Sequence, residues 1–168
     1  HYDFNFSKLK HLDLSNSKIS FASLMFILYN SKLEKLYLKR INLYKYFKHI
    51  TNSQKDTLKE LDISSFRKYW HDSHALDIST INLLTNLTLL KINNLTFSYQ
   101  TFFKILELPN LKILEMANCY FKHNWKYCVC QDLHEIIPYL NKLKVLKISD
   151  DIFCSKSKQI IYEKFENL

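Results

Sequence analysis

The chain has 168 residues, of which 47% are apolar and 15% aromatic, so it can bury one hydrophobic core and is not an intrinsically disordered chain. Its formal net charge of +8 favours an acidic partner such as nucleic acid, an anionic membrane surface or an acidic protein. The complete absence of glycine excludes glycine-rich phosphate loops, nucleophile elbows and dinucleotide-binding fingerprints, so we expect no enzyme, no cofactor and no small-molecule substrate.

Turns that need a positive φ must use Asn, Asp or Ser in place of glycine. The strong preference for Lys, with Arg only at positions 40 and 67, indicates codon drift in an AT-rich genome. Apolar runs such as Phe26-Ile27-Leu28-Tyr29 are far shorter than the roughly 20 residues that span a bilayer, so no membrane span is predicted. Because the chain begins at His1, we expect it to be part of a longer protein. Its cysteines are interpreted as reduced thiols, which favours an intracellular, cytoplasmic location.

A short pattern, L-x-x-L-x-[LIM], recurs six times along the chain. Its copies begin at Leu9, Leu33, Leu58, Leu87, Leu111 and Leu143, at spacings of 24, 25, 29, 24 and 32 residues. The second and third apolar positions of each copy alternate with variable ones, which is typical of a short strand with one face in a core. We therefore expect six strands.

Helical spacing of apolar residues follows the copies along the chain. The helical faces comprise Phe21, Leu24, Met25 and Leu28, then Tyr46, Phe47 and Ile50, then Phe102, Phe103 and Leu106, then Leu133, Ile136, Ile137 and Leu140. Loops are expected at about 67–76 and 122–130, and residues 155–168 are expected to form a C-terminal helix or cap. A strand and a helix cannot bury their apolar faces alone, so the units are expected to stack, with a parallel sheet inside and helices outside.

These segments resemble leucine-rich repeats, whose consensus is L-x-x-L-x-L-x-x-[NC]-x-L. The best copy runs from Leu111 to Phe121 and has Cys119 at the Asn/Cys position. Repeat length is similar to that of the intracellular ribonuclease-inhibitor-like and cysteine-containing classes. The resemblance implies an α/β fold: one right-handed, horseshoe-shaped solenoid domain over residues 1–168, with about six strand–helix repeats, a concave parallel sheet and helices on the convex side.

The chain departs from the consensus at the Asn/Cys position. The other five copies carry Ser17, Ile41, Phe66, Leu95 and Asp151 there, and Asn stands one place earlier in three copies, as Asn16, Asn94 and Asn118. We therefore expect a weakened ladder of side-chain hydrogen bonds and an arc less regular than is usual in the family.

Two clusters of potential metal ligands are interpreted as non-functional. The cluster of His123, Cys128, Cys130 and His134 spans twelve residues, but its C-x-C spacing is too short for both thiolates to reach one tetrahedral zinc ion. The run from His71 to His74, with Asp77, lacks a shaped pocket and is interpreted as a surface loop. We predict neither a metal site nor catalytic residues.

The resemblance implies binding through the variable strand positions of the concave face. The expected partner-binding residues are Tyr37, Leu89, Lys91, Ile113, Glu115, Val145 and Lys147. Leu89, Ile113 and Val145 occupy equivalent positions on adjacent predicted strands, which indicates an exposed apolar stripe. The position between the last two apolar residues carries both signs of charge, which favours a protein surface over uniformly anionic RNA.

The sequence therefore predicts a non-catalytic scaffold for protein–protein interaction. One alternative is a basic accessory subunit of a ribonucleoprotein such as the ribosome. Its candidate contacts with an anionic partner are Lys32, Lys35, Lys39, Arg40, Lys45 and Lys48. Another alternative, a substrate adaptor of a ubiquitin ligase, requires a recruiting domain outside this sequence.

Overall fold

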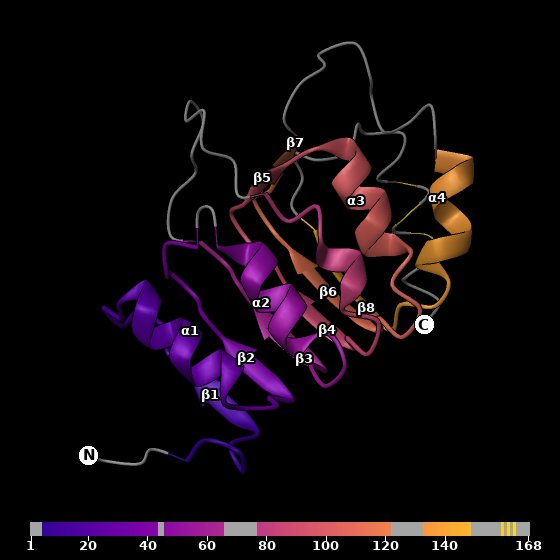
Figure 1. The fold of residues 1–168 in the computed structure, drawn as a ribbon. Coiled ribbons are helices and arrows are strands. Elements are labelled where there is room, and N and C mark those ends of the chain that lie inside the picture. Colours follow the sequence, from indigo (N-terminus) through magenta and orange to yellow (C-terminus); the bar gives the residue numbers. More distant parts are fainter. Residues whose placement is uncertain are drawn as a thin grey trace.

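The computed structural model describes residues 5–43, 46–65, 77–121 and 133–148, together with Gln159, Ile161 and Glu163. Figure 1 shows how strands and helices alternate along this part of the chain. The strands are β1 (His11–Asp13), β2 (Lys35–Tyr37), β3 (Glu60–Asp62), β4 (Leu89–Lys91), β5 (Thr96–Phe97), β6 (Ile113–Met116), β7 (Tyr120–Phe121) and β8 (Val145–Ile148). The helices are α1 (Phe21–Tyr29), α2 (Phe47–Gln54), the 3-10 turn η1 (Ile81–Leu83), α3 (Tyr99–Leu106) and α4 (Leu133–Leu140).

Six strands form one parallel sheet in the order β1-β2-β3-β4-β6-β8, which is their order along the chain. Each is the strand expected from one copy of the repeat pattern. The second leucine of every copy pairs with its equivalents, in the row Leu12, Leu36, Leu61, Leu90, Leu114 and Leu146. The remaining strands, β5 and β7, form a separate parallel pair. The six predicted strands are therefore confirmed, and all six share one register.

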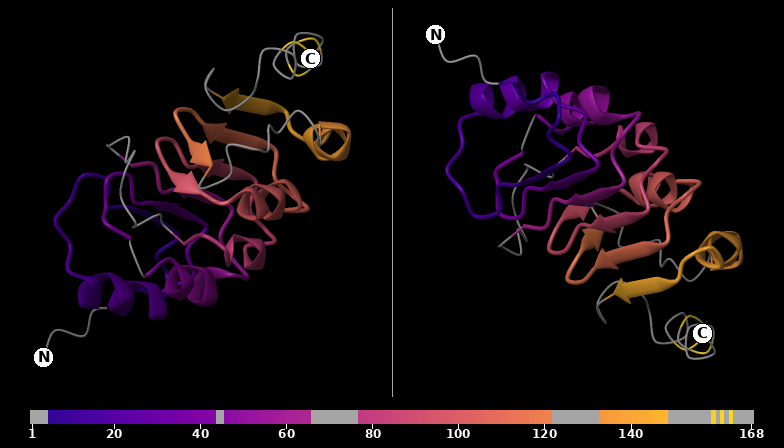
Figure 2. Two further views of the ribbon diagram at one scale, coloured as in Figure 1. Left: turned by 90° about the horizontal axis from the view of Figure 1, so that it is seen from above. Right: turned by 90° about the horizontal axis from the view of Figure 1, so that it is seen from below.

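The helices lie along one side of the sheet, as both views of Figure 2 show. Between the two layers lies the hydrophobic core, in which Leu36, Leu61 and Leu90 are 0% exposed. Ile50 and Ile105 reach this core from α2 and α3. Full burial of such a side chain stabilises the folded state by roughly 1.5–3 kcal/mol. The structure is thus a mixed α/β fold with a parallel sheet covered by helices on one face.

The expected helical faces agree with the structure in most positions. Leu24, Met25 and Leu28 are buried on α1, whereas Phe21 is half-buried. On α3 the buried positions are Phe102, Ile105 and Leu106, while the expected Phe103 is half-buried. Ile136 and Leu140 are buried on α4, Ile137 is half-buried, and the side chain of Leu133 lies outside the described residues.

Residues of positive φ follow the strands at equivalent positions. They are Asn16, Arg40, Asn94 and Asn118, with φ between 55° and 66°. Each stands three residues after the third register position of its strand, at the end of the strand. Asn tolerates this left-handed conformation better than most residues because its short polar side chain makes local hydrogen bonds. The Asn residues one place before the consensus position therefore supply turns for which this chain has no glycine.

The consensus Asn/Cys position makes few side-chain hydrogen bonds. At the four described copies, residues 17, 41, 95 and 119, only the thiol of Cys119 does so, donating to the carbonyl of Ile92 at 2.9 Å. Leu95 fills the same position with a buried apolar side chain. Neighbouring units are instead joined elsewhere: Asn86 donates to the Asp56 carbonyl, and Asn110 donates to the Thr85 carbonyl, both at 2.9 Å.

Gln54 is a further connection between units. Its side chain is 0% exposed at the end of α2. The side-chain oxygen accepts the N–H of Leu33 at 2.8 Å, and the side-chain nitrogen donates to the carbonyls of Leu28 and Ser31. These bonds satisfy backbone groups in the turn between α1 and β2 that would otherwise be buried without partners.

Both expected loops, at about 67–76 and 122–130, lie outside the described residues. Of the expected C-terminal helix or cap at 155–168, Gln159, Ile161 and Glu163 are described and helical. Ile161 is buried and belongs to the hydrophobic core.

Candidate functional site

The sheet face opposite the helices is called the open face below, and two rows of side chains cross it. Strand side chains alternate between the two faces, and the shared register aligns equivalent residues on neighbouring strands. The first row is His11, Lys35, Glu60, Leu89, Ile113 and Val145, and the second is Asp13, Tyr37, Asp62, Lys91, Glu115 and Lys147. All seven residues predicted to bind a partner stand in these rows.

Three apolar residues are consecutive in the first row. Leu89 pairs with Ile113, and Ile113 pairs with Val145, so they occupy neighbouring strands about 4.8 Å apart. Leu89 and Ile113 are half-buried, and Val145 is 36% exposed. The expected apolar stripe is thus present as a continuous arrangement over β4, β6 and β8.

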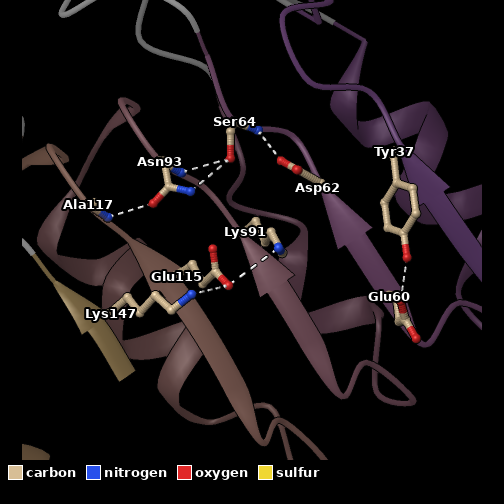
Figure 3. Close-up of polar contacts among 9 residues, drawn as sticks. All are labelled: Tyr37, Glu60, Asp62, Ser64, Lys91, Asn93, Glu115, Ala117 and Lys147. Carbon is tan, nitrogen blue, oxygen red and sulfur yellow. Dashed lines mark hydrogen bonds and ion pairs between the residues drawn. The ribbon is translucent and has the colours of Figure 1, made fainter. Parts of the chain in front are cut away.

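Beside the stripe, Glu115 joins two lysines of the second row. Its Oε1 atom lies 3.3 Å from Lys91 Nζ and 3.1 Å from Lys147 Nζ (Figure 3). Burial alone would raise the pKa of Glu115, but the hydrogen bonds and positive charges of Lys147 and Lys91 outweigh it and lower the pKa. The ion-paired group holds one more positive than negative charge.

At the other end of the rows, Glu60 connects Lys35 and Tyr37. Lys35 Nζ lies 2.7 Å from a Glu60 carboxylate oxygen, and the Tyr37 hydroxyl donates to the other (Figure 3). Burial would raise the pKa of Glu60, but its hydrogen bonds to Lys35 and Tyr37 and the lysine charge lower it. Burial, followed by the hydrogen bond to Glu60, raises the pKa of Tyr37 to about 12. The tyrosine is therefore a neutral donor held in one orientation.

A hollow of about 470 Å³ opens between these two groups. It is lined by Asp13, Ser15, Tyr37, Lys39, Asp62, Leu89 and Lys91. An oxygen of Asp13 accepts the N–H of Ser15 at 2.8 Å, and one of Asp62 accepts the N–H of Ser64 at 2.9 Å. The side-chain and backbone hydrogen bonds of Ser15 lower the pKa of Asp13. Among the described residues, neither aspartate forms an ion pair.

A polar bridge aligns the ends of three strands. Asn93 accepts the N–H of Ala117 at 2.7 Å through its side-chain oxygen. Its backbone and side-chain nitrogens donate to the hydroxyl of Ser64 at 3.2 and 3.3 Å (Figure 3). The repeat pattern does not predict this bridge, although Ser64 and Asn93 both stand two residues after a strand. It fixes the segments that follow β3, β4 and β6 relative to one another, beside the open face.

Of the six basic residues considered for an anionic partner, the five that the structure describes do not form one patch. Lys35 is ion-paired on the open face, Lys39 and Arg40 follow β2, and Lys48 is on α2 in the helix layer. Lys32 precedes β2 in the turn from α1, and Lys45 lies outside the described residues. A single contact surface cannot include both the helix layer and the open face.

The predicted metal-ligand clusters fall largely outside the described residues: positions 71–74, 123, 128 and 130, and the side chain of His134, are not described. Asp77 is described, and it accepts the N–H of Ser79 at 2.9 Å. Within the described ranges no group of three or more His, Cys, Asp or Glu side chains is arranged to hold a metal ion.

No protein-family model, no curated protein and no solved structure matches the chain. In the part of the chain that the structure describes, no helix is both long and apolar enough to cross a membrane. The function is therefore argued from the geometry and charges of the open face.

Proposed function

We propose that the chain is a leucine-rich-repeat solenoid that works as a non-catalytic scaffold and binds a protein partner through the open face. The observation that carries this proposal is the shared register of the six strands, which aligns all seven candidate contact residues in two adjacent rows. Repeated units of this kind create extended surfaces on which variable residues contact a partner. The apolar stripe adds partly exposed apolar surface, and its removal from water by a partner would favour binding.

Charge favours a protein over a nucleic acid as the partner. The two rows hold three lysines and four carboxylates, so together they carry one more negative than positive charge although the whole chain is +8. A nucleic-acid surface would need cations that follow the phosphate backbone. The ribonucleoprotein alternative has less support because the five described residues of its basic set lie on different sides of the molecule.

The proposal includes an intracellular, cytoplasmic location. The reduced thiol of Cys119 supports it: the side chain is 1% exposed, and burial raises its pKa to about 12. A buried, protonated thiol that donates to the carbonyl of Ile92 is a packing element and does not react readily.

The experiment compares two substitutions of equally exposed apolar residues on opposite layers. Val145 on the open face is 36% exposed, and Leu83 in the helix layer is 38% exposed. Partners captured from the native source by the unmodified chain are identified by mass spectrometry and then measured with Val145→Asp and Leu83→Asp. We expect Val145→Asp to weaken capture at least about tenfold, the effect of losing roughly 1.4 kcal/mol, and Leu83→Asp to leave it unchanged. Equal capture by both folded variants would contradict binding through the open face.

A further inference from the structure

The open face divides into two halves of different chemistry. On β4, β6 and β8 it carries the apolar stripe and the ion-paired group of Lys91, Glu115 and Lys147. On β1, β2 and β3 the second row runs Asp13, Tyr37, Asp62, so that an aromatic residue stands between two carboxylates on adjacent strands. The hollow lies at the boundary, because its lining includes both aspartates, Tyr37 and the first stripe residue, Leu89.

The negative charge of Asp13 and Asp62 is only partly offset by nearby lysines. Lys91 is the direct register neighbour of Asp62, yet it forms its ion pair with Glu115. Lys35 is similarly committed to Glu60. Lys39 lines the hollow and forms no ion pair with any described residue, so it offsets one of the two carboxylate charges. Two carboxylates and one unpaired lysine thus leave one net negative charge for a ligand.

Other features of the hollow also suit a positively charged ligand. Each aspartate accepts a backbone N–H through one oxygen, which fixes its orientation. Asp13 also accepts a hydrogen bond from the side chain of Ser15, and each carboxylate keeps lone pairs for a further donor. Tyr37 contributes an aromatic surface, and its hydroxyl is turned to Glu60 (Figure 3). Carboxylates accept strong hydrogen bonds from guanidinium and ammonium groups, and an aromatic ring attracts the same cations.

We propose that the hollow receives a basic side chain, arginine in the first instance, from an extended segment of the partner protein. This inference rests on the proposed function and names the chemistry of the partner. The guanidinium group lies between Asp13 and Asp62 beside Tyr37, and apolar side chains of the same segment cover Leu89, Ile113 and Val145.

Strand spacing sets the sequence of such a segment. Tyr37 and Leu89 are on β2 and β4, which are two strand positions apart in the sheet and so separated by about 10 Å. Residues on the same side of an extended chain are an even number of positions apart, and four positions cover about 13 Å, which spans the two strands and the offset between the two rows. The segment therefore carries its first apolar residue four positions after the arginine and a second one two positions later, so that all three side chains face the sheet.

The test uses the synthetic peptide acetyl-Arg-Thr-Ser-Thr-Leu-Thr-Val-amide and a matched peptide with Glu in place of Arg. Binding to the whole chain is measured by NMR titration at low salt. We expect the Arg peptide to shift the amide signals of Asp13, Tyr37 and Asp62, and to bind about tenfold more tightly than the Glu peptide, which corresponds to roughly 1.4 kcal/mol. Its affinity should fall as salt is raised, because exposed charges are screened. Absence of binding, or equal binding of the two peptides, would overturn the proposal.

Variants separate this inference from the function on which it rests. In Asp13→Asn and Asp62→Asn the side-chain oxygen can still accept the same backbone N–H while the charge is removed. Each should weaken the Arg peptide about fivefold or more, whereas the control Asp56→Asn, at an exposed turn after α2, should not. If both aspartate variants keep full affinity for the Arg peptide while Val145→Asp still loses the captured partner, the cationic site is wrong and the scaffold function stands. If Val145→Asp also keeps its captured partner, the scaffold function fails with it.

Discussion

Arg40 is the exception among the described residues of positive φ, since the other three are Asn. Its φ of 66° brings a long side chain into a conformation that costs an ordinary residue about 1 kcal/mol. The guanidinium group donates to the side-chain oxygen of Asn16 at 3.0 Å, which offsets part of this cost at an exposed position. The turn after β2 is therefore less favourable than the equivalent turns after β4 and β6.

Replacing Arg40 with Asn should stabilise the fold by about 0.5–1 kcal/mol, because Asn adopts this conformation more easily. Urea denaturation measures the change in the free energy of unfolding. Arg40→Ala is the control: it loses the same contact with Asn16 without gaining the tolerance of Asn, and it should not stabilise. A stabilisation shared by both variants would point to the side-chain contact and not to the backbone conformation.

Replacing Gln54 with Ala should destabilise the fold by about 2–4 kcal/mol. The change leaves the N–H of Leu33 and the carbonyl of Leu28 without this partner in a buried turn and also creates a cavity. The same denaturation experiment on Asn52→Ala, an exposed position of α2, gives the baseline and should change stability by less than about 0.5 kcal/mol. A loss at Gln54 no larger than the loss at Asn52 would contradict the role of the buried Gln54 hydrogen bonds, because Ala is the better helix former at both positions.

At the scale of elements, α1 and α3 begin with side-chain caps and α2 does not. The hydroxyl of Ser20 accepts the N–H of Ser23 at 3.1 Å, and that of Ser98 accepts the N–H of Thr101 at 3.2 Å. Tyr46, at the start of α2, makes no side-chain cap hydrogen bond. The first turns of α1 and α3 thus each have one unpaired N–H fewer than that of α2.

Ser98→Ala should lower the stability of the fold by about 1 kcal/mol, the usual effect of losing a cap. Thermal unfolding followed by circular dichroism measures it, and Ser98→Asp should restore most of the loss because aspartate also caps helices well. If Ser98→Asp remains as unstable as Ser98→Ala, the hydroxyl contributes through its contact with Thr101 Oγ1 and not through capping.

The strands and helices could be predicted because the apolar spacing of each one lies within a short stretch of sequence. The two rows of the open face followed from the same pattern once equivalent positions were assumed to align. The polar bridge of Ser64, Asn93 and Ala117 could not be found in this way, because it depends on where side chains 24 and 29 residues apart come to lie. The pairing of Lys91 with Glu115 in preference to Asp62 could not be predicted either, since both carboxylates are its register neighbours.

For the whole molecule, several carboxylates have a lowered pKa in the folded state. They are Asp13, Glu34, Glu60, Asp77 and Glu115. A carboxylate with a depressed folded-state pKa contributes stability that is present above its unfolded pKa and is lost as the pH falls through the folded pKa. The ordinary values are 3.8 for Asp and 4.5 for Glu, so the loss begins near pH 4.5 and continues below it.

These carboxylates are ionised in both the folded and the unfolded state between pH 6 and 7, so we expect them not to change the melting temperature there. Below about pH 4.5 we expect the melting temperature to fall steadily. Thermal unfolding at a series of pH values measures this dependence. The double variant Glu60→Gln/Glu115→Gln replaces the two more buried of these glutamates. It should reduce the fall of the melting temperature per pH unit below about pH 4.5. An unchanged slope would assign the acid sensitivity to other groups.

Because strand order in the sheet follows chain order, each strand within the described ranges pairs in the sheet with those of the neighbouring units. A stretching force applied to the two ends would release units one at a time from an end, and each 24- to 32-residue unit would add about 80–110 Å of contour length. The hollow with its carboxylates lies mainly on the first three strands, and the apolar stripe on the last three. Tension would thus unfold one half of the open face while the other half remains folded, and the partner would lose its contacts in two steps.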